Sequence, residues 1–200
     1  MSKNRDIYRP TKVGVFEFFE VEHEVPSPFL AEVKEVYKKV KKTFEQYPES
    51  KHYSEDEKRN MILGWLAEKL FDMILNEHDI LHVWYHPLIQ DEMVKERKKV
   101  KVDFRVHNDF IDVKASSHKN PSYFFVGCER AETHPADFYV FFHFDKFPEP
   151  EKGWLSGWIS SQELKKYPKK QYYQIVYEIP RSNLKPFSLL LQRWKRGRGV

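Results

Sequence analysis

This chain has little cysteine and glycine and a small net charge. Its 200 residues include a single cysteine, Cys128, and seven glycines, and the formal net charge at pH 7 is only +4. One cysteine excludes an internal disulfide and also a zinc site built from several cysteines of one chain. The small net charge permits a polyanionic partner without requiring one.

Long apolar runs are also missing. No run approaches the length that spans a membrane, and the first residues lack the apolar core of a signal peptide. Hydrophobic residues make up 40% of the chain and charged residues 32%, a balance typical of a soluble globular protein. We therefore expect a single cytoplasmic domain that spans residues 1–200 and has no membrane partner.

Helical and strand patterns are both present. Ser27 and Pro28 suit the start of a helix that ends near Tyr47, and Ser54 and Glu57 have the spacing of a capping box that opens a second helix. Strands are expected over 13–22, 81–89, 100–106, 110–115, 123–126, 136–144, 153–159 and 172–179, short helices over 128–134 and 160–167, and a charged loop over 91–99. This order predicts an α/β fold with a mixed, partly antiparallel sheet.

The segment "VDFRVHNDFIDVKAS", residues 102–116, has the pattern of a β-hairpin. Asn108 and Asp109 both tolerate positive φ and would form a two-residue turn. With this turn, every apolar residue of one strand faces an apolar residue of the other. A slip of one residue would mix the two faces, so the even register is favoured.

The polar face of this hairpin collects charged side chains. In the predicted register Arg105 faces Asp112, and Asp103 faces Lys114. Two neighbouring carboxylates repel each other unless positive charge lies between them. The positive charge could be Mg²⁺ held against a phosphate, since Mg²⁺ prefers oxygen ligands. Alternatively, the residues form a salt-bridged, solvent-exposed face of an ordinary strand pair.

A third acid lies in the second helix. Glu68 falls between the apolar stripe and the polar face, and Gly64 lies one turn before it. Glycine destabilises a helix, so its presence suggests that another element approaches closely there. Glu68 could be directed at the hairpin as a third acid, or it could be a surface acid paired with Lys69.

These residues resemble the motif of the PD-(D/E)XK nuclease superfamily, which has the restriction-endonuclease-like fold. The resemblance rests on Glu68 in a helix, then Asp103, then "IDVKAS" with Asp112 and Lys114. The proline that leads the family motif is absent, because Val102 precedes Asp103. The later segments "ADFYVFFHF" and "GWLSGWISSQEL" are also similar to strands and a helix of the family. The similarity covers roughly residues 54–165, which leaves additions at 1–50 and 170–200.

The resemblance implies a role for each matched residue. Glu68, Asp103, Asp112 and the carbonyl of Val113 would bind Mg²⁺ or Mn²⁺, and Lys114 would be the catalytic lysine. The implied activity is metal-dependent hydrolysis of phosphodiester bonds in DNA by an endonuclease, of a restriction, defence or mobile-element type.

Two other interpretations remain open. The chain could be a nucleic-acid-binding protein that keeps the fold without the reaction, or a structural α/β domain that binds a partner. A homodimer is expected for the nuclease, because cutting both strands of a duplex usually requires two sites.

Overall fold

The computed structural model of the chain describes residues 21–24, 35, 38, 54–85, 102–146, 150 and 152–196. The helix expected over 27–47, apart from residues 35 and 38, and the loop expected over 91–99 lie outside the described residues. The same is true of the strand expected over 13–22, except for its last two residues.

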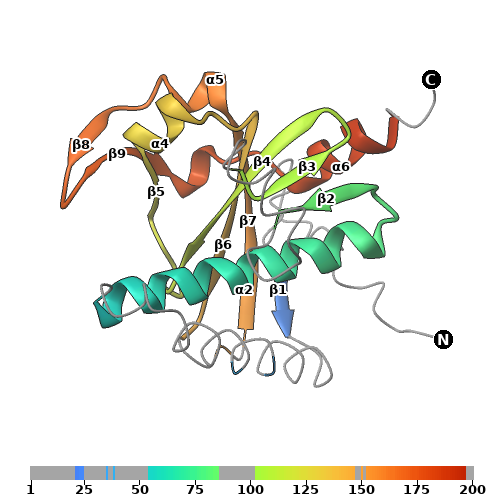
Figure 1. The fold of residues 1–200 in the computed structure, drawn as a ribbon, viewed down its shortest axis with the longest axis horizontal. Coiled ribbons are helices and arrows are strands. Elements are labelled where there is room, and N and C mark those ends of the chain that lie inside the picture. The colour runs from blue at the N-terminus through green and yellow to red at the C-terminus, as the bar shows by residue number, and fades with distance from the viewer. Residues whose placement is uncertain are drawn as a thin grey trace.

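Helix α2, Glu55–Glu77, is the longest described helix and begins where the sequence predicts (Figure 1). The Ser54 hydroxyl accepts a hydrogen bond from the Glu57 N–H, and the Glu57 carboxylate accepts one from the Ser54 N–H. The predicted capping box is therefore confirmed, and it satisfies two backbone donors that a helix start leaves open.

Among the described residues, six strands form the central sheet, in the order β1-β7-β6-β4-β3-β2. Their bounds are β1 Val21–Glu24, β2 His82–Trp84, β3 Phe104–Val106, β4 Asp109–Ser116, β6 Phe138–Phe144 and β7 Lys152–Ser160. Strands β4 and β6 are parallel, and the other neighbours are antiparallel. The prediction of an α/β fold with a mixed sheet is confirmed.

A second sheet of three strands was not predicted. It has the order β5-β9-β8, with bounds β5 Tyr123–Gly127, β8 Lys169–Gln171 and β9 Ile175–Pro180. The remaining helical elements are α4 Cys128–Thr133, α5 Ser161–Leu164, the 3₁₀ turn η3 Arg181–Asn183 and α6 Phe187–Arg196. The connection between the parallel strands β4 and β6 runs through β5 and α4, which attaches the smaller sheet to the central one.

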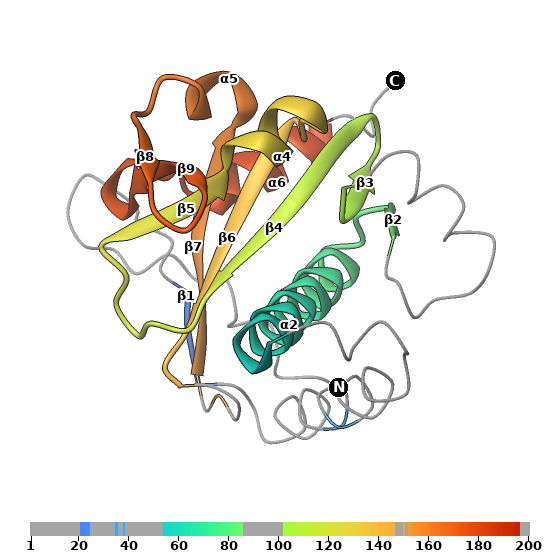
Figure 2. The same ribbon diagram turned by 60° about the vertical axis from the view of Figure 1, so that its left-hand side comes forward.

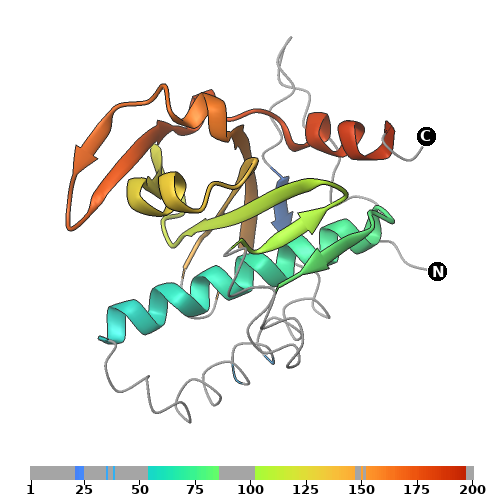
Figure 3. The same cartoon turned by 45° about the horizontal axis from the view of Figure 1, so that its top comes forward.

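The central sheet is covered on both faces. Helices α2 and α6 pack on one face, and the smaller sheet with α4 packs on the other (Figures 2 and 3). All seven residues of β6 are buried, because their side chains alternate between these two cores. A side chain on β4 is therefore directed either toward α2 or toward α4.

The predicted turn of the hairpin is displaced by one position. The turn residues are His107 and Asn108, and His107 has a φ of +53°. Arg105 consequently pairs with Phe110, so the predicted pairing of Arg105 with Asp112 is wrong. The pairing partners shift by two residues, which preserves the two faces of the hairpin because side chains alternate with a period of two.

The displaced turn has a tertiary cause. It places Asp109 at the first position of β4, where its carboxylate accepts two hydrogen bonds from Arg193 and one from Trp194 of α6. A two-pronged arginine–carboxylate pair of this kind is stronger than a single contact. Helix α6 thus fixes where β4 begins.

Candidate functional site

Strand β3 begins at Phe104, and Asp103, the residue before it, lies beside β4. The Asp103 N–H donates to the carbonyl of Ile111, and the Asp103 carboxylate accepts the N–H of Val113 at 2.7 Å. The carboxylate therefore takes the place of a strand acceptor at the point where the strand pairing stops. This hydrogen bond holds the buried side chain of Asp103 against β4.

Asp112 and Lys114 lie on the face of β4 that is directed toward α4. Their partners on β6 are Tyr139 and Phe141, which belong to the core between the two sheets. The Lys114 ammonium lies 2.5 Å from Oδ2 of Asp112, and the Asp112 side chain is almost fully buried. The hairpin thus brings Asp103, Asp112 and Lys114 together, as its sequence pattern predicts.

Arg130 of α4 completes the cluster and was not predicted. Its Nη2 atom lies 3.2 Å from Oδ1 of Asp112 and 3.5 Å from Oδ1 of Asp103. The two carboxylates therefore share one guanidinium nitrogen, while Lys114 takes the second oxygen of Asp112. Sequence patterns gave no signal for Arg130, because only the packing of α4 against the central sheet brings it here.

The two aspartates have opposite electrostatic states. Burial, together with the charges of Glu68 and Asp112, holds the pKa of Asp103 well above its ordinary value. Burial also acts against the charge of Asp112, but Lys114 and Arg130 overcome this effect and lower the pKa of Asp112. Burial and neighbouring carboxylates therefore disfavour the charge of Asp103, whereas the two cations favour the charge of Asp112.

Tyr139 lies beside this cluster on β6. Burial and the charge of Asp112 raise the pKa of Tyr139 to about 12. Its hydroxyl is buried and has no hydrogen-bond partner of good geometry among the described residues.

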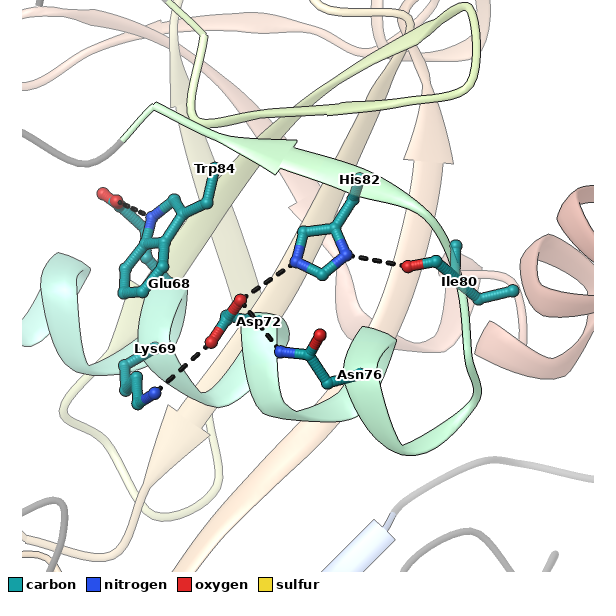
Figure 4. Close-up of polar contacts among 7 residues, drawn as sticks. All are labelled: Glu68, Lys69, Asp72, Asn76, Ile80, His82 and Trp84. Atoms are coloured by element: carbon teal, nitrogen blue, oxygen red, sulfur yellow. Dashed lines mark hydrogen bonds and ion pairs between the residues drawn. The ribbon is translucent and has the colours of Figure 1, made fainter. Parts of the chain in front are cut away.

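Glu68 belongs to α2, which packs on the opposite face of the central sheet from α4. It is close enough to the cluster for its charge to raise the pKa of Asp103. It is buried, and its carboxylate accepts a hydrogen bond from Trp84 Nε1 at 3.0 Å (Figure 4). The Trp84 ring is stacked on Phe104, with 5.7 Å between ring centroids, next to Asp103 in the chain. The interpretation of Glu68 as a surface acid is therefore wrong, and its charge acts directly on the pKa of Asp103.

The described residues do not bear out the expectation for Gly64. A Cβ atom added at Gly64 would meet nothing within 4 Å beyond its own neighbours and helix backbone. No other described element lies close to this turn of α2, so Gly64 does not explain the orientation of Glu68. Trp84 explains it instead, and sequence patterns gave no signal for Trp84.

A second polar network lies one turn along α2 (Figure 4). The Asp72 carboxylate is bonded to Lys69 at 3.3 Å, to Asn76 at 3.1 Å and to His82 Nε2 at 2.9 Å. His82 Nδ1 lies 2.8 Å from the carbonyl of Ile80. Both nitrogens of His82 thus meet acceptors; burial acts to lower the pKa of His82, but the bonds to Asp72 and to the Ile80 carbonyl raise it. This network attaches β2, and with it Trp84, to α2.

The donor chemistry of the Asp103–Asp112 cluster fits a hard divalent cation. Its oxygens belong to two buried carboxylates, the ligand type that such a cation prefers, and each of the four already meets Val113 N–H, Arg130 or Lys114. Within the part of the chain that the structure describes, no three His, Cys, Asp or Glu side chains are arranged to hold a metal ion. Val113 enters the site through its N–H, and its role as a carbonyl ligand stays a prediction.

Comparison of the chain with protein-family models, with curated proteins and with solved structures finds no match in any of the three. In the described residues, every helix is too short or too polar to cross a bilayer.

Proposed function

We propose that this chain is a metal-dependent nuclease with a restriction-endonuclease-like core that hydrolyses phosphodiester bonds in DNA. The observation that carries the proposal is the pairing of two buried carboxylates, Asp103 and Asp112, with Lys114 against one of them. Their opposite pKa shifts indicate a site built for more positive charge than the chain supplies. Shifts of this kind, from burial plus named charges, are concentrated at functional sites.

Each residue has a defined part in this proposal. Asp103 and Asp112 would hold Mg²⁺ or Mn²⁺, and Glu68 would bind it directly or through water. The metal, when bound, would activate water and neutralise charge on the phosphate. Lys114 lies against Asp112, where its ammonium would bind a phosphate oxygen and stabilise the charge that develops there.

The choice of DNA as substrate rests on the family resemblance of the motif. A homodimer would supply the two sites needed to cut a duplex, which is the arrangement we propose for an enzyme of restriction, defence or mobile-element type.

The test is cleavage of plasmid and of single-stranded DNA in Mg²⁺, in Mn²⁺ and in EDTA. We expect cleavage with either metal and none with EDTA. The variant Asp112→Asn should be inactive, while Asp56→Asn, a matched change at an exposed position of α2, should cut like the wild type. Cleavage that persists in EDTA, or that survives in Asp112→Asn, would reject the proposal.

A second candidate is a nucleic-acid-binding domain without catalysis. It is favoured because two cations of the chain, Lys114 and Arg130, already neutralise Asp112. The same experiment separates it from the nuclease, because such a domain would bind DNA equally with and without metal and would leave it intact.

A further inference from the structure

Arg130 reaches the site from a different layer of the protein than the acids it contacts. The two aspartates belong to the β3–β4 hairpin, whereas Arg130 belongs to α4, which packs with the smaller sheet (Figure 3). Its Nη2 atom lies between the Oδ1 atoms of Asp112 and Asp103, at 3.2 and 3.5 Å. A metal ion bound to both Oδ1 atoms at a coordination distance of about 2.0–2.6 Å would need this same space.

The two cations of the cluster differ in how easily they can leave. The Lys114 side chain is 21% exposed and rises from the middle of β4, whereas the Arg130 side chain is 49% exposed. Helix α4 is anchored by other residues, since Cys128 and Ala131 are its buried positions. Because Arg130 is half exposed and is not one of the buried positions of α4, its displacement requires rotation of the side chain and no movement of the α4 backbone.

We infer that Arg130 is a stand-in cation: it holds Asp103 and Asp112 together in the metal-free protein and is displaced when a divalent metal binds. This inference rests on the proposed function, because it assumes that the two carboxylates take a metal. It explains how two buried acids avoid strong repulsion before the metal arrives. It also makes Arg130 a competitor of the metal in the free protein.

The displaced guanidinium remains tethered to α4, beside the site. A guanidinium presents two parallel N–H donors that match the oxygens of a phosphate. Arg130 would then contact the phosphodiester that the metal binds, so that one side chain acts first on the acids and later on the substrate. Its two effects on the reaction have opposite signs: it weakens metal binding and strengthens DNA binding.

The first test is calorimetric titration of Mn²⁺ into the metal-free protein. Arg130→Met keeps the apolar stem of the side chain and removes the guanidinium, and we expect it to bind Mn²⁺ about tenfold more tightly, because no charge-assisted hydrogen bond has to be broken. The Mn²⁺ affinity of Arg130→Lys should lie between those of the wild type and Arg130→Met, since an ammonium cannot bridge both acids in the same way. Arg196→Met, at an exposed position of α6, is the charge control and should match the wild type.

The second test measures the position of Arg130 without any cleavage. Phenylglyoxal labels accessible arginines, and mass spectrometry reports the extent at Arg130. We expect Mg²⁺ to increase labelling of Arg130 several-fold in the wild type and to have no effect in Asp112→Asn. This readout also works if the Arg130 variants fail to fold.

The outcomes separate the inference from the function on which it rests. If the wild type binds Mn²⁺, Asp112→Asn does not, and Arg130→Met binds no more tightly than the wild type, then the stand-in role is overturned and the metal site stands. Protection of Arg130 by Mg²⁺, instead of exposure, would also overturn it. If the wild type and Asp112→Asn bind Mn²⁺ equally, or neither binds, both proposals fall.

Discussion

Two polar clusters flank the contact between Glu68 and Trp84, and the pKa values of their aspartates shift in opposite directions. The Asp72 cluster supplies Lys69, Asn76 and His82 to one carboxylate; burial acts to raise the pKa of Asp72, but His82 and Lys69 lower it. The Asp103 cluster places one acid among others, and burial with the neighbouring charges raises the pKa of Asp103. The partners of the first cluster favour the charge of its acid, whereas the second cluster keeps one acid with a raised pKa although Lys114 and Arg130 lie beside it.

This difference is the one that our proposed function predicts between a structural cluster and a binding site. A network whose donors and acceptors match stabilises the fold and needs nothing more. A network with excess carboxylate costs folding free energy, and a protein keeps such a cost at sites that bind a charged ligand. The resemblance in sequence gave the acids of the second cluster, but the contrast in pKa gives an independent physical reason to regard it as the site.

The largest effect should come from Lys114→Ala, which removes a cation from the Asp103 cluster. We expect cleavage of DNA to fall at least about a hundredfold, because the developing charge on the phosphate loses its donor. DNA binding should change little, since affinity comes from many phosphate contacts. The measurement is initial cleavage rate together with DNA affinity in Mg²⁺.

The matched control for this change is Lys166→Ala, which removes an exposed lysine after α5. It should cut at the wild-type rate. Lys114→Arg should also be poor, because a guanidinium has another shape and does not give up its proton. If Lys114→Ala kept full activity, the polar face of the hairpin would be an ordinary charged face and Lys114 would not be catalytic.

The second prediction compares the stability of two aspartate-to-asparagine variants. Asp72→Asn should lower the free energy of unfolding by about 2 kcal/mol, because it removes charge-assisted bonds to Lys69 and His82. Asp103→Asn should leave the melting temperature of the metal-free protein unchanged or raise it. Its raised pKa means that the folded state holds a proton that the unfolded state releases as pH rises above 3.8, so near neutral pH this acid destabilises the fold.

Asp112→Asn supplies the control within the same cluster. The pKa of Asp112 is lowered, with burial opposing and Lys114 and Arg130 prevailing, so its charge stabilises the fold. Removing that charge should lower the melting temperature, in contrast to Asp103→Asn. Equal effects of the two variants would show that the acids share their charge evenly, against the assignment made here.

Sequence patterns predicted those parts of the fold that depend on local chemistry. The start of α2 follows from Ser54 and Glu57, which lie three residues apart. The two faces of the hairpin follow from alternation, which a two-residue shift leaves intact. The turn itself could not be predicted, because Arg193 and Trp194 fix Asp109 from 84 and 85 residues away.

For the candidate site, too, sequence patterns predicted only what depends on local alternation. Asp103, Asp112 and Lys114 lie within one hairpin, so alternation alone places them together. Arg130 and Trp84 enter through the packing of α4 and β2, which lie 18 and 16 residues from their acidic partners, Asp112 and Glu68. No periodic pattern encodes such contacts, and they decide how the acids are neutralised and oriented.

The third prediction tests whether Trp84 orients Glu68. Trp84→Phe keeps an aromatic ring on Phe104 and removes the N–H that Glu68 accepts. We expect Mn²⁺ affinity to fall about tenfold, the lower end of the effect of losing an outer partner of a metal ligand. The control is Trp158→Phe, which removes a similar N–H bond to the carbonyl of Pro186 and should leave Mn²⁺ affinity unchanged. A fall of equal size in both variants would assign the effect to lost packing.

The smallest effect should be the pH dependence of the Asp72 cluster. Burial alone would lower the pKa of His82, but the bonds to Asp72 and to the Ile80 carbonyl raise it above its ordinary value of 6.5. A raised pKa means that the folded state binds a proton more tightly than the unfolded state. The stabilising contribution of His82 is therefore complete below pH 6.5 and is lost as the pH rises through the folded pKa. Melting temperatures of the metal-free protein measured from about pH 5.5 to about pH 8.5 should show this loss.

His82→Phe isolates this contribution from the other titrating groups. The ring of His82 lies beside Phe104, with 5.9 Å between centroids, so phenylalanine keeps an aromatic neighbour there and removes both nitrogens. The difference in melting temperature between wild type and His82→Phe should shrink as the pH rises, while exposed His118→Phe should show no such trend. A difference that stays constant with pH would mean that His82 is neutral in the folded protein. In that case one of its two nitrogens would lack a proton for its acceptor. The donors and acceptors of the Asp72 cluster would then not match, and its contrast with the Asp103 cluster would fail.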